Sequence, residues 1–203
     1  MSNSRRPAVA PPAAKADGRV ERSVRTRSKI AAAVLELVGS GVLDPTAEAV
    51  AAKAGVGYRT VFRHFEDMEA LFDELNAKIA EIVLAGLPDL PPGQAPAGTR
   101  AERIEAFVMR RAQVFEAITN YYLSGNIRQH SSASLQRWRT GFAHMLRRQQ
   151  ASYLPESVAE PETAALVELV ATIDAWVRLR RLQGLDVDAA RAVVQRGVTA
   201  LLA

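Results

Sequence analysis

The chain has 203 residues, of which 48% are hydrophobic, 24% are charged and none is cysteine. These values exclude a disordered chain, and the lack of cysteine excludes disulfides, thiolate metal sites and cysteine nucleophiles. The net charge is +4, and the excess lies in the first third, because residues 1–66 carry 11 Lys/Arg against 6 Asp/Glu while residues 67–203 carry 15 against 16. A basic N-terminal third on an otherwise nearly neutral chain predicts that this part binds a polyanion. The alternative is that the positive charge belongs only to a solvated tail.

Two features of the sequence bear on location. No apolar run reaches the roughly 18 residues that span a bilayer. Pro7, Pro11 and Pro12 stand where a secretory signal would have its apolar stretch. We therefore expect a cytoplasmic protein with no membrane partner.

Residues 1–20 are rich in proline and alanine and carry Arg5, Arg6, Lys15 and Arg19, with no periodic apolar face. This composition predicts a flexible basic arm. It fits a contact with DNA and a disordered tail with incidental arginines equally well.

Residues 21–66 are predicted to form three helices. Apolar residues recur with helical spacing from Ile30 to Val38, and the glycines that follow end this first helix. Thr46 suits the N-cap of a second helix, and Gly55 suits the turn after it because glycine tolerates positive φ. A third helix is expected from about Tyr58 to Phe65. Two short helices joined by a glycine turn have the geometry of a helix-turn-helix motif.

The third helix is expected to place one face on the core and the other on DNA. Its outward residues would be Tyr58, Arg59, Thr60, Arg63 and His64. A short helix of this kind lies in the major groove with its N-terminal residues at base edges, where an arginine pairs bidentately with guanine. The alternative is a helical hairpin with a charged, solvated face.

The segment AGVGYRTVFRHF (residues 54–65), followed by Leu71 and Phe72, resembles the TetR-type regulators. The similarity covers residues 24–75. It implies three DNA-binding helices, a connecting fourth helix and a helical domain that binds a ligand and dimerises. We therefore expect an all-α fold of about nine helices, with a DNA-binding domain over 21–66 and an effector-binding and dimerisation domain over 67–203.

Within this resemblance, Thr46 matches a threonine that starts the second helix and touches phosphate. Gly57, Tyr58, Arg59 and Thr60 match the groove-facing start of the recognition helix. Arg63 and His64 match its later contact positions.

Two positions depart from the family pattern. Phe62 stands where a tyrosine often bonds a phosphate, and Met68 stands where a phosphate-binding lysine is common. Because both changes weaken the grip on the DNA backbone, we expect Arg25 and Arg27 of the first helix to contact phosphates.

Beyond residue 66 the pattern predicts helices only. They are expected over 67–85, 99–122, 133–153, 162–183 and 187–202, with a loop at 86–99 and a break or short helix at 124–132.

Large apolar residues of the long helices are candidates for an effector cavity. They are Phe107, Phe115, Tyr122, Trp138, Phe142, Met145 and Trp176. Such residues on facing helices line apolar cavities, although the same spacing is that of an ordinary core. Arg111 lies in the same stripe and, if buried, needs an anionic ligand or a carboxylate such as Asp174, unless its charged end reaches the surface.

The last two predicted helices carry apolar stripes from Leu166 to Val177 and from Ala190 to Leu201. Two such helices from each of two chains form a four-helix interface, although the stripes also fit the closing of one chain's own core. Since one short recognition helix reads few bases and two-fold symmetry doubles the site, we expect a homodimer.

Nothing in the sequence indicates an enzyme, a metal site or a cofactor. His130 and His144 lack the spacing of helical metal ligands, and there is no Walker loop, dinucleotide fingerprint or GxSxG elbow. The expected function is a ligand-responsive repressor that binds a palindromic DNA operator and a small-molecule effector. The alternatives are a DNA-binding regulator without an effector and, less favoured, an enzyme on a helical bundle.

Overall fold

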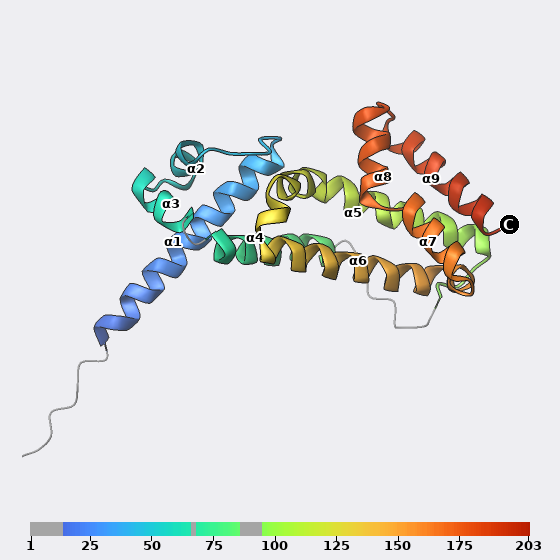
Figure 1. Cartoon of the computed structure of the whole chain (residues 1–203), viewed down its shortest axis with the longest axis horizontal. Coiled ribbons are helices and arrows are strands. Elements are labelled where there is room, and N and C mark those ends of the chain that lie inside the picture. Colours follow the sequence, from blue (N-terminus) through green and yellow to red (C-terminus); the bar gives the residue numbers. More distant parts are fainter. Residues whose placement is uncertain (1–13, 66–67, 86–94) are drawn as a thin grey trace, which may run out of the picture.

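The computed structural model describes residues 14–65, 68–85 and 95–203, and within these ranges the regular structure is entirely helical (Figure 1). The helices are α1 (Ala14–Gly39), α2 (Ala47–Ala54), α3 (Tyr58–Phe65), α4 (Met68–Ala85), α5 (Arg100–Arg128), α6 (Ala133–Tyr153), α7 (Pro161–Val170), α8 (Ile173–Val177) and α9 (Val187–Leu201). A π-helical turn, Arg178–Leu182, continues α8, and short 3-10 turns follow α5 and α6. The predicted all-α class is confirmed.

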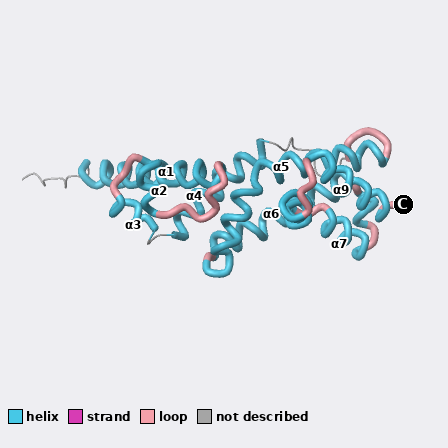
Figure 2. Tube along the Cα trace, turned by 90° about the horizontal axis from the view of Figure 1, so that it is seen from above, coloured by secondary structure: helices cyan, strands magenta, loops and turns pink. Residues whose placement is uncertain are grey.

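The helices fall into two groups along an elongated molecule (Figures 1 and 2). At one end α1, α2, α3 and the start of α4 enclose a small core that includes Ile30, Val50, Val61 and Leu71. The remaining helices enclose a larger core. Helix α4 joins the two, because its later residues, such as Ile79, belong to the larger core.

Helix α1 begins at Ala14, within the segment expected to be a flexible arm up to residue 20. The last proline of the region is Pro12, and the alanines and lysine that follow favour helix. The expected start near Glu21 is therefore corrected to Ala14. Residues 1–13, with Arg5 and Arg6, lie outside the described residues.

Helix α5 begins with a capping box in which Thr99 accepts from the backbone N–H of Glu102 and the Glu102 carboxylate accepts from that of Thr99. It continues to Arg128, past the end expected at Tyr122, and the expected break is reduced to the 3-10 turn Gln129–Ser131. The extension places the last turns of α5 beside the end of α1.

The segment expected as one helix over 162–183 is two helices that meet at Ala171 and Thr172. Thr172 caps α8 by accepting from the Ala175 N–H at 3.1 Å. The carbonyl of Ala171, past the end of α7, accepts from the guanidinium of buried Arg111. A helix end needs partners for its free carbonyls, and here one comes from α5, which the local pattern does not reveal.

Candidate functional site

Helices α2 and α3 form the helix-turn-helix predicted from the sequence. Thr46 is the N-cap of α2, and its hydroxyl accepts from the Ala49 N–H at 3.2 Å. Gly55 caps the C-terminus with φ of 65°, the left-handed conformation that favours glycine. Both local predictions are confirmed, and the left-handed Gly55 turns the chain from α2 toward α3.

The inner face of α3 is carried by Val61, which is fully buried against Val50 of α2 and Ile30 of α1. Its outer face carries Arg59 and Arg63, both exposed, while Thr60 is half-buried. Gly57, just before α3, is exposed and has an ordinary φ, so no backbone strain requires glycine there. The outer surface of α3 is therefore basic and open along the turn and the first helical turns.

Two exposed aromatic residues flank these arginines. Tyr58 and Phe62 are 47% and 53% exposed, and their ring centroids lie 6.2 Å apart. Phe62 thus adds apolar surface to the outer face of α3, as well as lacking a hydroxyl for phosphate.

Two predicted DNA-contacting residues lie on α1. Arg25 is exposed and Arg27 is half-buried. The first part of α1 extends past α2 and α3 on the side away from the bundle (Figures 1 and 2). His64 belongs to α3 by its backbone, but its side chain, like that of Met68, lies outside the described residues.

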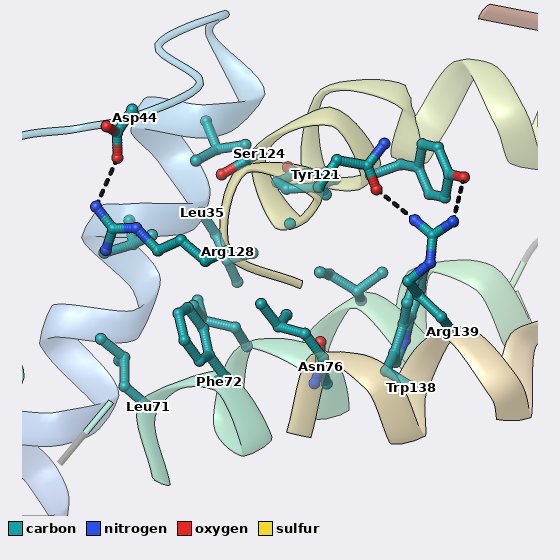
Figure 3. Close-up of a pocket in the computed structure, with 18 of the residues that line it drawn as sticks. Leu35, Asp44, Leu71, Phe72, Asn76, Tyr121, Ser124, Arg128, Trp138 and Arg139 are labelled. Carbon is teal, nitrogen blue, oxygen red and sulfur yellow. Dashed lines mark hydrogen bonds and ion pairs between the residues drawn. The ribbon is translucent and has the colours of Figure 1, made fainter. Parts of the chain in front are cut away.

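A cavity lies at the junction of the two groups of helices, with an empty volume of about 850 Å³ that includes its open mouth. It is bordered by α1, α4, α5 and α6 (Figure 3). Its apolar wall consists of Val34, Leu35, Val38, Pro45, Leu71, Phe72, Leu75, Ile79, Tyr121, Leu135 and Trp138. Because α1 and α4 also build the DNA-binding domain, a molecule bound here would touch both parts of the protein.

The polar end of the cavity is organised around Arg139 of α6. Its guanidinium donates to Asn126 Oδ1 and to Tyr122 Oη, the latter at 2.9 Å, and lies over the Tyr122 ring (Figure 3). The Tyr122 hydroxyl in turn donates to Asp174 at 2.7 Å. Burial and the nearby Asp174 carboxylate raise the pKa of Tyr122, so the phenol keeps its proton at neutral pH.

Further contacts near the end of α1 and the loop that follows it join α5 to the DNA-binding domain. Arg128 donates to Asp44, in the loop before α2, at 2.8 Å (Figure 3). Asn120 donates to the carbonyl of Gly39 at 3.1 Å. A Cβ at Gly39 would lie 2.8 Å from the Tyr121 hydroxyl, so glycine permits this close approach of α1 and α5.

Two adjacent carboxylates of α4 accept hydrogen bonds from two different helices. Glu74 accepts from Ser28 of α1 at 2.5 Å, whereas Asp73 accepts from Ser134 of α6 at 2.5 Å. The Ser134 hydrogen bond lowers the pKa of Asp73. Helix α4 is thereby tied to α1 and α6, the two helices that face it across the cavity.

Of the predicted ligand-binding residues, Tyr122 and Trp138 line this cavity. Phe107, Phe115, Phe142 and Trp176 are buried in the larger core, and Met145 packs against it. None of these five residues, nor Arg111, lines the cavity. The cavity residues of α1 and α4 were not singled out from the sequence, since they carry the same helical periodicity as any core position.

Arg111 is buried and bonded to the protein itself. It donates to the carbonyls of Leu146 (2.7 Å) and Ala171 and to the side chain of Gln149 (3.2 Å), with its guanidinium 4.4 Å from the Phe107 ring centroid. Burial lowers the pKa of Arg111 to about 9, which leaves it charged at neutral pH. The suggested partner Asp174 is corrected, because that carboxylate bonds Tyr122, and the guanidinium does not reach the surface.

The residues that the structure describes contain neither a cluster of metal ligands nor a membrane-spanning helix. No group of three or more histidine, aspartate or glutamate side chains is arranged to hold a metal ion. No helix is both long and apolar enough to cross a membrane.

The comparisons with known proteins concern the family and the fold. Residues 30–75 match the family model described as bacterial regulatory proteins, tetR family. The structure resembles that of a transcriptional regulator from Rhodococcus sp. Rha1, with a TM-score of 0.61, 19% sequence identity, and coverage of 87% of this chain and 95% of that one. At this identity the likeness shows a shared fold.

A search of curated proteins gives no significant match to the sequence. The family match covers the last ten residues of α1, all of α2 and α3, and the start of α4, including Gly55 and the outer face of α3. These are the residues from which the helix-turn-helix is built. Residues 30–75 are therefore similar to the tetR family of bacterial regulatory proteins, and the match includes α2 and α3, the helix-turn-helix of a DNA-binding domain.

Proposed function

We propose that this DNA-binding regulator is a ligand-responsive repressor that binds a palindromic operator as a homodimer and releases it when an effector occupies the cavity between α1, α4, α5 and α6. The observation that carries the proposal is the position of this cavity. It is bordered by Leu71, which belongs to the core of the DNA-binding domain, and by Leu35, which packs against that core.

On DNA, α3 lies in the major groove with its outer face on the bases. Arg59 pairs with a guanine, while Tyr58 and Phe62 contact thymine methyls and sugars. Thr46, Arg25 and Arg27 contact phosphates, and Gly57 lets the backbone come close to the DNA. Arg63 and His64 occupy the later part of the groove. A palindrome presents the same half-site to each subunit.

Release follows from differential binding of the effector. A ligand shifts the protein toward the state that it binds more tightly, and coupling free energies of about 1–3 kcal/mol are typical. A molecule between α1 and α5 competes with the close approach of Gly39 and Tyr121 and with the Arg128–Asp44 ion pair. Movement at these contacts changes the position of α2 and α3 relative to the bundle, and hence the spacing of two recognition helices in a dimer.

The homodimer is proposed to form through the C-terminal helices. Ala190, Val194 and Val198 of α9 are buried in the chain's own core, so this stripe is already occupied. The apolar side chains left exposed are Leu166 and Leu169 on α7, Leu182 after α8 and Val193 on α9. We assign these four residues to the dimer interface.

Replacing Leu169, which is 65% exposed, with arginine is expected to raise the dimer dissociation constant about a hundredfold or more. Each subunit loses an apolar contact worth roughly 1.5–3 kcal/mol, and the two-fold axis brings two new charges together. Sedimentation velocity over a range of concentrations measures the change. Leu84→Arg is the matched control, since Leu84 is 59% exposed on α4 and lies outside the proposed interface. A Leu169→Arg protein as dimeric as the Leu84→Arg protein would contradict the assignment.

The effector role is tested by filling the cavity. Ser124 lines it and is half-buried, and its side chain forms no hydrogen bond with the described residues that the substitution would break. Ser124→Trp is therefore expected to occupy the space while preserving operator binding. A library of small amphipathic acids, alcohols and amines is screened by gel shift for release of the wild-type protein from an operator selected from random DNA. Compounds that release the wild type are expected to lose at least tenfold in potency against Ser124→Trp.

The matched control is Thr140→Trp, on the exposed side of α6. It should respond to the same compounds as the wild type does. Release of the Ser124→Trp protein at unchanged concentrations would place the effector elsewhere. A screen in which no compound acts would favour regulation without a small-molecule effector.

A further inference from the structure

The cavity is largely apolar, and the charged side chains that line it do not balance. Three charged side chains line it: Asp44, Arg128 and Arg139. Asp44 and Arg128 form an ion pair with each other at 2.8 Å. The third, Arg139, forms no ion pair with any carboxylate in the described part of the chain, because both of its bonded acceptors, Asn126 and Tyr122, are neutral. The lining therefore has a net charge of +1.

We propose that the ligand of this cavity is an amphipathic monocarboxylate, with its carboxylate on Arg139 and its apolar body against Phe72, Leu75 and Trp138. This inference rests on the proposed effector role of the cavity and names the chemical class of the effector. The guanidinium is planar and suits a carboxylate in a two-bond geometry. Arg139 has no direct ion pair among the described residues, and the Asp174 carboxylate beyond it is bonded to the Tyr122 hydroxyl, so the guanidinium favours a monoanion over a neutral molecule, a cation or a dianion.

The surroundings of Arg139 strengthen this selection. The side chain is half-buried, and the wall beside it is aromatic and aliphatic, so the attraction of opposite charges is screened less than at the surface. Charge-assisted hydrogen bonds are roughly twice as strong as neutral ones. A ligand carboxylate therefore competes well with Asn126 and Tyr122 for the guanidinium.

The same exchange connects the ligand to the DNA-binding domain. Asn126 lies in the last turn of α5, two positions before Arg128, which holds Asp44 before α2. When the carboxylate replaces Asn126 on Arg139, the last turn of α5 loses its bond to α6. The ligand thereby acts on the contact between α5 and the loop that leads to the helix-turn-helix.

The test compares three probes of one chain length with the full-length protein by isothermal titration calorimetry: decanoate, decan-1-ol and decyltrimethylammonium. Decanoate is expected to bind at least about tenfold more tightly than decan-1-ol, and the ammonium compound least tightly. Arg139→Gln is expected to reduce decanoate affinity to that of the alcohol while alcohol binding stays the same. Arg139→Lys, which keeps the charge, should retain most of the preference.

Arg137→Gln is the matched control. Arg137 lies on the same helix, is exposed and pairs with Asp73 at the surface, so its loss should leave the preference intact. The ratio of the wild-type affinities for decanoate and decan-1-ol is measured without any variant. It therefore tests the proposal even if Arg139→Gln folds poorly, which the midpoint of its thermal unfolding reveals.

Equal binding of decanoate and decan-1-ol to the wild type overturns the ligand class. The ligand class is also overturned if the Arg139→Gln protein still prefers the acid, or if the wild type binds none of the three probes. The effector role itself is judged separately by the gel-shift screen with Ser124→Trp, which includes neutral and basic compounds. If a neutral compound releases the wild-type protein from the operator but not the Ser124→Trp protein, the effector role is supported and the proposal of a carboxylate ligand is rejected.

Discussion

Replacing Arg59 with alanine is expected to weaken specific operator binding by about 10- to 100-fold while leaving folding and dimerisation unchanged. Arg59 is exposed in the first turn of α3 and forms no part of the core. A bidentate arginine–guanine pair contributes roughly 1–3 kcal/mol of discrimination, and a dimer loses it in both half-sites. Fluorescence anisotropy with an operator selected by the wild-type protein measures the change.

A second DNA of random sequence separates base reading from phosphate binding. If Arg59 reads a base, affinity for random DNA should fall far less than affinity for the operator. Arg147→Ala is the matched control, because Arg147 is exposed on α6 and pairs with Glu168 away from α3. Equal losses on both DNAs would make Arg59 a phosphate contact, and unchanged operator affinity would remove it from the interface.

Replacing buried Arg111 with methionine is expected to lower the free energy of unfolding by roughly 2–5 kcal/mol. Methionine fills much of the same volume, but it offers no donor to the carbonyls of Leu146 and Ala171 or to Gln149. Buried acceptors that lose their donor cost about 1–3 kcal/mol each. Urea unfolding followed by circular dichroism measures the difference.

The adjacent Arg110 provides the control. It is only half-buried and bonds Gln113 within its own helix at 3.4 Å, so Arg110→Met should change the unfolding free energy by no more than about 0.5 kcal/mol. A loss below about 1 kcal/mol for Arg111→Met would mean that the guanidinium does not hold α5, α6 and the α7–α8 break together. DNA affinity of the folded Arg111→Met protein should stay close to that of the wild type.

The two arginines on facing helices have different roles because their surroundings differ. Arg111 bonds carbonyls whose positions the fold already sets, and it lies outside the cavity. Arg139 bonds neutral side chains at the edge of an open space. The first is therefore a structural cation, and the second is the one available to a ligand.

The DNA-binding domain could be predicted from the sequence because its signals are local. The cap at Thr46, the left-handed Gly55 and the buried Val50 and Val61 lie within a short stretch, and each acts on its immediate neighbours. The outward positions of Tyr58 and Arg59 follow directly from the helical period once Val61 is placed inside.

The cavity and the partner of Arg111 could be decided only by tertiary structure. The cavity is formed by side chains of α1, α4, α5 and α6, which have the same apolar spacing as filled core positions. Arg111 and Ala171 are 60 residues apart, and their contact breaks a segment whose own pattern predicts one continuous helix. Periodicity determines which side of a helix faces inward. Whether the inside is filled, and which helix end a buried charge meets, depends on how distant helices pack.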